Sequence, residues 1–189
     1  MSVFFPAGTF YEDFNLNFDV KNNRIYIHED TVPVHSNFTI TIKDSTYSEV
    51  LRDKLFIGKI SGNNKSYNAT TRKNDVFTAK SKILGQFGLV LDTIAPTIKI
   101  AKPIQDKWIS DLKTIQFTIS DNLSGIKSYN GYLNGNWILF EYDNKTKKIT
   151  HKFEDGIVAE GANDLKIEVV DNVGNSAIFE THFFRSQQK

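Results

Sequence analysis

Alternation of apolar and polar side chains is the feature that most constrains this chain. In residues 114–119 and 165–169 every second side chain is aliphatic or aromatic, and the side chains between them are polar. Residues 14–20 follow the same period of two. That period places apolar side chains on one face of a β-strand and polar side chains on the other. The sequence therefore predicts three strands, each with one buried face.

The remainder of the chain also favours strands over helices. Aromatic residues make up 13% of the chain, and they suit a pleated, half-buried surface, as do Ile, Val and Thr. Further strands are predicted at 24–28, 38–43, 54–61, 75–82, 97–101 and 176–184. No segment keeps apolar residues at i, i+3, i+4 and i+7 over the length that a stable helix needs. We expect an all-β fold, with a helical turn only within 46–54.

The segment 91–97, Leu-Asp-Thr-Ile-Ala-Pro-Thr, divides the chain almost in half. Pro96 has no N–H for a strand ladder and biases Ala95 toward extended backbone, so a strand that ends near Leu91 has to restart after it. Each half approaches the roughly 100 residues of an immunoglobulin-like sandwich. We predict two tandem immunoglobulin-like β-sandwich domains, 1–92 and 93–189. One continuous barrel is the alternative.

The clearest hairpin signal is Asn134-Gly135, which lies between the predicted strands 128–133 and 136–142. Asn-Gly readily takes the two positive φ angles of a type I′ turn, whose twist matches the flanking strands. A second reversal at 143–145 leads into a further predicted strand at 147–153. These strands form a predicted three-stranded meander.

The usual routes to catalysis are missing from the sequence. The chain has no Cys, which excludes thiolate metal sites, Cys nucleophiles and disulfides. Its four His residues show no His-x-His or His-Glu-x-x-His spacing, and no Gly-x-Ser-x-Gly, Walker or Rossmann pattern occurs. We therefore predict a protein that is not an enzyme, with no catalytic residue, cofactor or metal site. Two alternatives are a hydrolase whose carboxylate pair is assembled by the fold, and a metal site of His28, Glu29, Asp30 and His35.

The balance of charged residues argues against nucleic acids and anionic membranes as partners. Lys and Arg number 23 against 22 Asp and Glu, a formal net charge of +1. A chain this close to neutral lacks the basic field that attracts nucleic acids or anionic membranes. No apolar run approaches the roughly 20 residues of a membrane span, and the first residues are too short a stretch for a signal peptide. We expect no nucleic-acid partner and no membrane span, with any export signal outside this chain.

Two similar loops end predicted strands, one beginning at Asp121-Asn122 and the other at Asp171-Asn172. Asp and Asn side chains bond to backbone N–H groups two residues on, and the nearby glycines accommodate positive φ, so both loops are predicted to be structural turns. Carboxylate and carbonyl oxygens are also the ligands that Ca²⁺ prefers. Asp121 and Asp171 are therefore weak candidates for a calcium site.

Aromatic residues give the best sequence indication of an interaction surface. In 137–142 both alternating sets of side chains are largely apolar, so we expect the face opposite the core to be covered by the other domain or by a partner. The predicted interaction surface is Trp108, Trp137, Phe140 and Tyr142. Because aromatic rings also stack on sugars, a carbohydrate- or surface-binding adhesion module is the alternative function.

Several short segments of the sequence resemble segments of known protein families. The segments 92–96 (DTIAP), 121–126 (DNLSGI) and 171–175 (DNVGN) resemble the skeleton of bacterial immunoglobulin-like repeats on exported proteins. The segments 5–13, 71–73, 107–110 and 134–143 are similar to the region downstream of the catalytic domain in some Gram-negative lysostaphin-type (LytM-type) zinc endopeptidases. The similarity spans about 4–184, and its motifs are structural phrases.

The active site of that family uses a His, an Asp and a His-x-His pair, and no position here matches them. The resemblance therefore implies a non-catalytic accessory module of a bacterial cell-envelope peptidase that acts on peptidoglycan. The module would position or restrain a peptidase catalytic domain, in cis or in trans, in the periplasm, on the outer surface or as a secreted protein. Peptidoglycan or another glycan is a further expected partner.

Overall fold

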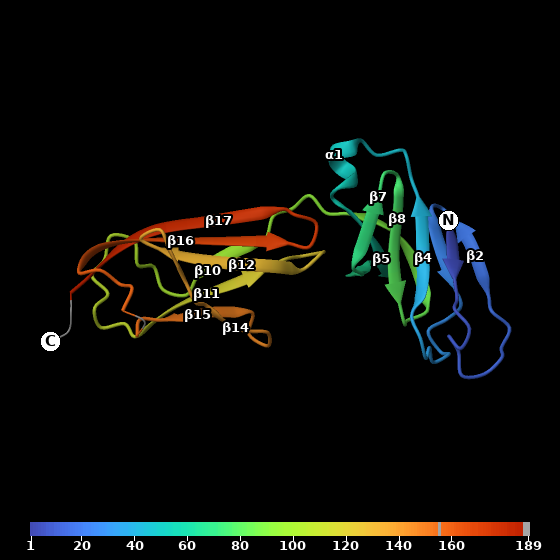
Figure 1. Ribbon diagram of the computed structural model, residues 1–189, viewed down its shortest axis with the longest axis horizontal. Coiled ribbons are helices and arrows are strands. Elements are labelled where there is room, and N and C mark those ends of the chain that lie inside the picture. Colours follow the sequence, from blue (N-terminus) through green and yellow to red (C-terminus); the bar gives the residue numbers. More distant parts are fainter. Residues whose placement is uncertain (155, 187–189) are drawn as a thin grey trace. The chain divides into compact units, whose positions relative to one another are not determined.

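The computed structural model describes residues 1–154 and 156–186. The chain divides into two compact units, Met1–Thr93 and Ile94–Lys189 (Figure 1). All strand pairs in the sheets of both units are antiparallel. The predicted all-β fold of two tandem β-sandwiches is confirmed. Among the described residues, no helix has the length and hydropathy needed to cross a lipid bilayer.

The first unit packs a four-stranded sheet, in the order β1-β4-β8-β7, and a five-stranded sheet, in the order β2-β3-β9-β5-β6. Its elements are β1 (Ser2–Phe4), β2 (Phe18–Lys21), β3 (Arg24–Ile27), β4 (Phe38–Lys43), α1 (Glu49–Arg52), β5 (Leu55–Ser61), β6 (Asn64–Tyr67), β7 (Thr70–Lys73), β8 (Val76–Ser81) and β9 (Gly85–Leu91). The helix α1 lies within the predicted helical turn at 46–54.

Alternation along the strands builds the core of the first unit. In β4 the side chains of Phe38, Ile40 and Ile42 are fully buried, and those between them are not. The Phe38 ring lies 5.2 Å from the ring of Phe5 and 6.3 Å from that of Phe87, measured between centroids. One core of aliphatic and aromatic side chains therefore joins the two sheets of this unit.

The predicted strand at 14–20 is only partly correct. The strand β2 begins at Phe18, and residues 14–17 form no strand. Its predicted buried face is also half exposed, with Phe18 48% and Val20 46% exposed. The physical reason is position, because β2 is the edge strand of the five-stranded sheet and covers less of the core than an inner strand does.

The second unit also contains two sheets, in the orders β10-β11-β15-β14 and β13-β12-β16-β17. Its strands are β10 (Thr97–Ile100), β11 (Thr114–Ser120), β12 (Ile126–Leu133), β13 (Asn136–Ile138), β14 (Glu141–Asp143), β15 (Lys148–Lys152), β16 (Gly161–Asp171) and β17 (Ser176–Arg185). The long hairpin of β16 and β17 has Leu165, Ile167 and Val169 on its inner face, all buried. Alternate residues of the same strands form the outer face, which carries the candidate site.

The segment 136–142 passes from one sheet to the other. Its first part, β13, pairs with β12 through Leu133↔Asn136, and Asn134 and Gly135 between them have φ values of 51° and 79°. Both angles are positive, as the Asn-Gly signal predicted. The next strand, β14, pairs with β15 in the opposite sheet. The predicted three-stranded meander is therefore wrong, because the chain changes sheets between Ile138 and Glu141.

Candidate ligand-binding face

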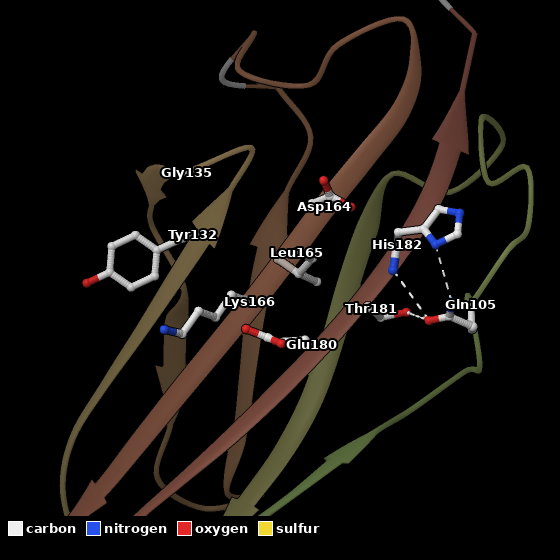
Figure 2. A pocket seen from close by; sticks show the side chains of 9 residues that line it. All are labelled: Gln105, Tyr132, Gly135, Asp164, Leu165, Lys166, Glu180, Thr181 and His182. Atoms are coloured by element: carbon white, nitrogen blue, oxygen red, sulfur yellow. Dashed lines mark hydrogen bonds between the residues drawn. The ribbon is translucent and has the colours of Figure 1, made fainter.

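The outer face of the sheet β13-β12-β16-β17 carries a row of large polar and aromatic side chains. Trp137 is paired with Tyr132, Tyr132 with Lys166, and Lys166 with Glu180, so these four residues run side by side across four strands. Figure 2 shows Tyr132, Lys166 and Glu180 on β12, β16 and β17. Directly paired residues point to the same side of a sheet. The row therefore lies on one surface, away from the core.

Trp137 is held at one edge of this surface. Its neighbour Ile138 points inward and is 1% exposed, whereas Trp137 is 55% exposed. The indole Nε1–H of Trp137 donates to Oδ1 of Asn130 at 3.4 Å, from the neighbouring strand. The strand thus turns the ring outward, and its N–H group contacts the amide of Asn130.

Trp108 lies at the opposite edge of the same surface. Its ring stacks on Phe184 of β17 with centroids 5.4 Å apart and planes 29° apart, and Trp108 is 64% exposed. The backbone around it is tied to β17, because the N–H of Ile109 donates to the Phe184 carbonyl at 2.9 Å and the N–H of Phe184 donates to the Lys107 carbonyl at 2.8 Å. Trp108 is therefore supported from below by both main chain and ring.

Arg185 holds the loop that follows Trp108. Its guanidinium donates to the carbonyls of Leu112 at 2.8 Å and Ile109 at 3.2 Å, and it lies over the Phe153 ring at 4.1 Å. Burial lowers the pKa of the Arg185 side chain. The contacts to neutral carbonyls satisfy the N–H groups that burial removes from water.

A polar network lies between the row and Trp108. The Thr181 hydroxyl donates to Oε1 of Gln105 at 2.7 Å, and Nε2 of His182 lies 3.0 Å from Oδ1 of Asp106. The His182 ring packs edge-on against Phe184, with centroids 5.3 Å apart. These contacts connect the 105–109 segment to β17 and hold His182 in place. Figure 2 shows the hydrogen bonds of Gln105 with Thr181 and His182.

The surface is hollowed at its centre. The depression has a volume of about 600 Å³ and is lined by Gln105, Tyr132, Gly135, Asp164, Leu165, Lys166, Glu180, Thr181 and His182. We call this outer face, with Trp137, Tyr132, Lys166, Glu180, His182 and Trp108, the tryptophan face. It combines flat aromatic rings, which can stack on a ligand, with hydrogen-bond donors and acceptors, which can orient it.

The four residues predicted as an interaction surface do not lie together. Trp108 and Trp137 lie on the tryptophan face. Phe140 is 3% exposed and belongs to the core, so its place in the predicted surface is corrected. Tyr142 is 37% exposed, but it lies on β14 of the opposite sheet, where its ring is 5.7 Å from that of Tyr129. In 137–140 one alternating set, Ile138 and Phe140, is buried, whereas the other, Trp137 and Leu139, is exposed.

Lys166, Glu180 and His182 were not predicted as site residues. Alternation in β16 did place Lys166 opposite the buried side chains, so its exposure follows from the sequence. What alternation alone leaves open is which residue of a neighbouring strand lies beside it. The register that brings Lys166 next to Tyr132 and Glu180 comes from the paired strands.

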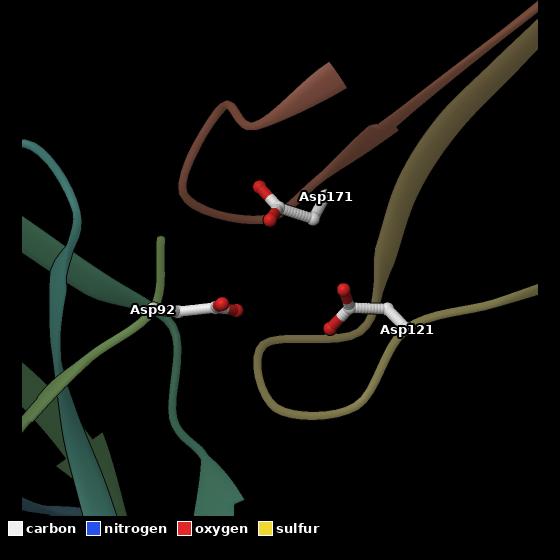
Figure 3. Close-up of side chains that lie close together, drawn as sticks. All are labelled: Asp92, Asp121 and Asp171. Carbon is white, nitrogen blue, oxygen red and sulfur yellow. The ribbon is translucent and has the colours of Figure 1, made fainter. Parts of the chain in front are cut away.

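The two Asp loops of the second unit form the predicted turns. Oδ2 of Asp121 accepts the N–H groups of Leu123 at 3.0 Å and Gly125 at 2.7 Å, and Oδ1 of Asp171 accepts those of Val173 at 3.0 Å and Asn175 at 2.7 Å. Figure 3 shows both carboxylates, and each has an oxygen within 4.8 Å of the other. Calcium binding by Asp121 and Asp171 stays a prediction, because the turns alone account for most of their oxygens.

Asp92, also drawn in Figure 3, belongs to the first unit. It is fully buried and follows β9, and its backbone N–H donates to the Lys54 carbonyl at 3.0 Å. Among the described residues, His28, Glu29, Asp30 and His35 form no group with metal-ligand spacing. Nδ1 of His28 instead accepts the N–H of Asn17 at 3.3 Å, and Asp30 pairs with Lys59 at 2.7 Å.

Comparisons with known proteins give one family match and several solved structures. Residues 1–92 match the model of the Zu5-like domain family. No curated protein sequence matches the chain. The fibronectin(III)-like modules of CbhA from Clostridium thermocellum are 15% identical with a TM-score of 0.40, covering 79% of this chain and 86% of that one.

Two structures of titin domains are similar at lower identity. The Ig tandem A164–A165 is 9% identical with a TM-score of 0.31, covering 81% of this chain and 88% of that one. A chimeric Z1Z2 tandem is 10% identical with a TM-score of 0.32, covering 80% and 92%. None of these matches is to a lysostaphin-type peptidase, so that resemblance rests on the sequence phrases alone.

Proposed function

We propose that the chain is a non-catalytic interaction module that binds its ligand through the tryptophan face of the second unit. The observation that carries this proposal is the exposure of Trp108 and Trp137 on one face of one sheet. Covering a large aromatic side chain yields more free energy than covering most other residues, and aromatic residues dominate binding surfaces. Two of them, each held by its neighbours, are costly to expose unless a ligand covers them.

The finer form of the proposal is an accessory module of a bacterial cell-envelope peptidase. Its mechanism is spatial, because the module holds a catalytic domain, in cis or in trans, against peptidoglycan or restrains it. The support is the resemblance at 107–110 and 134–143, since these two phrases contain Trp108 and Trp137. The phrases that resemble the peptidase region therefore supply both tryptophans of the face.

Two measurements on the 189-residue chain test this function. Sedimentation with purified Gram-negative peptidoglycan sacculi should deplete the chain from the supernatant, and analytical ultracentrifugation with a lysostaphin-type catalytic domain should reveal a complex. A complex with the catalytic domain supports an accessory module, whereas sedimentation without such a complex supports a cell-wall anchor. If the chain neither sediments with sacculi nor associates with the catalytic domain, the envelope function is wrong.

The second candidate is a carbohydrate- or surface-binding adhesion module that needs no peptidase. The mixture of flat rings and polar groups on the tryptophan face favours it. Binding to isolated glycans in the absence of any catalytic domain separates this candidate from the first.

A further inference from the structure

We infer that the tryptophan face binds a neutral polysaccharide chain, which lies across the four strands from Trp137 to Trp108. This inference rests on the proposed function and names the chemical class of its ligand. Sugar rings present flat C–H surfaces that stack on indole, and their hydroxyl groups exchange hydrogen bonds with carboxylate, ammonium and amide groups. The face supplies both kinds of contact, with an exposed ring at each edge and polar groups between them.

The spacing of the two tryptophans fits an extended ligand. Trp137 is on β13 at one edge, and Trp108 forms a bridge with Phe184 beyond the other edge strand, β17. Adjacent strands lie about 4.8 Å apart, which separates the two residues by about 19 Å across the sheet. Because Phe184 lies four residues beyond Glu180 on β17, there is a further offset of roughly 13 Å along the strands. The hollow lined by Lys166, Glu180 and His182 lies between them. A single sugar ring reaches one tryptophan only, whereas an oligosaccharide reaches both.

The distribution of residues on the face disfavours a protein partner. In protein interfaces the centre is depleted of charged residues and enriched in aromatic anchors, while the rim is polar. Here the order is reversed, because the charged residues Lys166 and Glu180 lie between the two tryptophans, which lie at opposite edges of the face. A protein would have to desolvate these central charges, whereas hydroxyl groups can bond to them.

The charges on the face also disfavour an anionic ligand. The outward-facing residues of β16 and β17 include three carboxylates, on Asp164, Glu168 and Glu180, and one ammonium group, on Lys166. This excess of negative charge repels nucleic acids and other acidic polymers. A neutral glycan meets no such repulsion.

The rings are positioned before any ligand arrives. Trp108 stacks on Phe184, and the indole N–H of Trp137 is bonded to Asn130. A side chain that is already ordered loses less entropy on binding, which strengthens the complex. Both rings keep exposed surface, at 64% and 55%, that a ligand can cover.

The chain offers an internal reporter for this test. Its only two tryptophans are Trp108 and Trp137, so intrinsic tryptophan fluorescence comes entirely from the tryptophan face. Titration with the hexasaccharides of N-acetylglucosamine and of glucose (cellohexaose) should shift or quench this emission, and calorimetry should give the affinity. The corresponding disaccharides should bind far more weakly, because they cannot span the face.

Variants locate the binding. Trp108→Ala and Trp137→Ala should each raise the Kd for the bound hexasaccharide about tenfold. Tyr142→Ala, an exposed aromatic on the opposite sheet, is the matched control and should leave the Kd unchanged. Circular dichroism checks that each variant is folded. The Kd should also be nearly independent of salt, since a neutral ligand releases no counterions.

Three outcomes would overturn the inference. The first is the lack of any fluorescence or heat signal with either hexasaccharide, and the second is binding of an anionic polysaccharide alone, weakened by salt. The third is sedimentation of Trp108→Ala/Trp137→Ala with sacculi as efficiently as the native chain. That last result leaves association with the cell envelope standing while it removes the tryptophan face as the binding surface, so the two failures are distinguishable.

Discussion

The two units expose apolar side chains in different ways. In the first unit Phe18 and Val20 of β2 pair with the fully buried Ile27 and Ile25, so they point to the core side of the sheet and are half exposed because β2 is an edge. In the second unit Trp108 and Trp137 lie on the outer side of the sheet, away from the core. The side chains of the first unit lie at the margin of its core, where the sheet ends. Those of the second unit lie on the face of the sheet that points to solvent. Exposure alone therefore does not identify a binding face, and the direction of the side chain decides.

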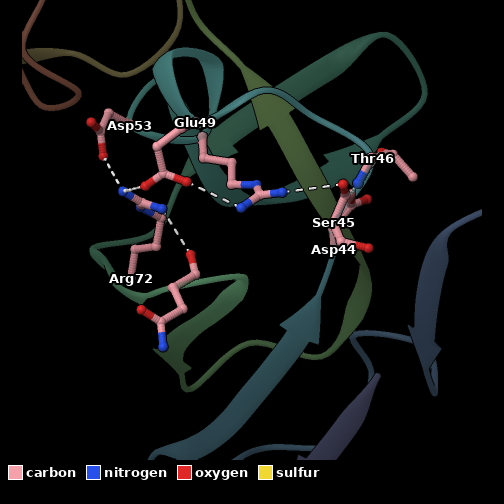
Figure 4. Close-up of polar contacts among 8 residues, drawn as sticks. Asp44, Ser45, Thr46, Glu49, Asp53 and Arg72 are labelled. Atoms are coloured by element: carbon pink, nitrogen blue, oxygen red, sulfur yellow. Dashed lines mark hydrogen bonds and ion pairs between the residues drawn. The ribbon is translucent and has the colours of Figure 1, made fainter.

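Carboxylates from the two units also show the contrast between a buried and an exposed acidic group. In the second unit the fully buried Asp171 closes a turn through backbone N–H groups. In the first unit Arg72 donates to Glu49 at 2.8 Å and to Asp53 at 2.7 Å on the surface beside α1 (Figure 4). Exposed ion pairs contribute little to the free energy of unfolding. Removal of a buried acceptor costs more, because it leaves the donors that were bonded to it without a partner. The second unit thus gains local rigidity beneath its loops.

The largest effect on stability is expected at a fully buried side chain in the core of the first unit. Phe38→Ala removes a fully buried ring and should lower the free energy of unfolding by about 3–5 kcal/mol. Phe4→Ala, at a 66% exposed side chain of the same unit, is the control and should change it by less than about 0.5 kcal/mol. Urea unfolding followed by amide NMR signals of the first unit measures both. Equal effects would contradict the core assignment.

The next largest effect on stability is expected at the buried carboxylate of Asp171 in the second unit. Asp171→Ala leaves the N–H groups of Val173 and Asn175 without this acceptor and should cost about 2–3 kcal/mol, measured by urea unfolding with tryptophan fluorescence. If the oxygens act through the turn, the native midpoint is equal in CaCl₂ and in EDTA. A rise with calcium that Asp171→Asn abolishes would support the calcium hypothesis.

Much of the fold follows from local sequence signals. The strands at 114–119 and 165–169 were predicted because alternation depends only on neighbouring residues, and the turn at Asn134-Gly135 was predicted because its φ angles are a property of two residues. Each of these signals acts over a few positions. The fold class, two tandem β-sandwiches, follows once enough such strands and turns are counted.

What was not predicted depends on partners distant in the sequence. Ile138 and Phe140 are both buried, so alternation continues through 137–140 while the chain changes sheets, and no local signal marks the change. For the tryptophan face, the sequence predicted Trp108 and Trp137 as surface residues but not their arrangement. Its two tryptophans are 29 residues apart in sequence, and only the pairing of β12, β16 and β17 places them on one surface.

A close contact beneath the tryptophan face gives the third prediction. A Cβ added at Gly131 would lie 2.3 Å from the Phe140 ring, so Gly131→Ala should cost about 1–3 kcal/mol. Adding Phe140→Leu should make room and recover part of that loss, so the two effects should not be additive. Fluorescence-detected urea unfolding of both single variants and the double variant measures the coupling. Strict additivity would show that the two residues do not compete for this space.

A pair of variants tests the contrast between Phe18, at the margin of the core, and Trp137, on the outer face of its sheet. Phe18→Ala removes half-buried apolar area and should cost about 1 kcal/mol. Trp137→Ala, at similar exposure, should cost less, because its ring covers no core, while it weakens ligand binding. Thermal unfolding by circular dichroism compares them. A larger loss of stability for Trp137→Ala would mean that this ring belongs to the structure and not to a binding face.

The smallest effect is expected at the charged surface beside α1. The hydrogen bond from Arg72 lowers the pKa of Glu49 below its ordinary value of 4.5. Because the folded state then holds the proton less tightly than the unfolded state, the contribution of Glu49 to stability is complete above pH 4.5 and is lost as the pH falls through the lowered pKa. Glu49→Gln should therefore lower the urea midpoint slightly at neutral pH, and the difference should vanish in acid. Glu12→Gln serves as a control in the same unit, and a difference for Glu49→Gln that persisted unchanged into acid would show that the loss comes from packing and not from the Arg72 pair.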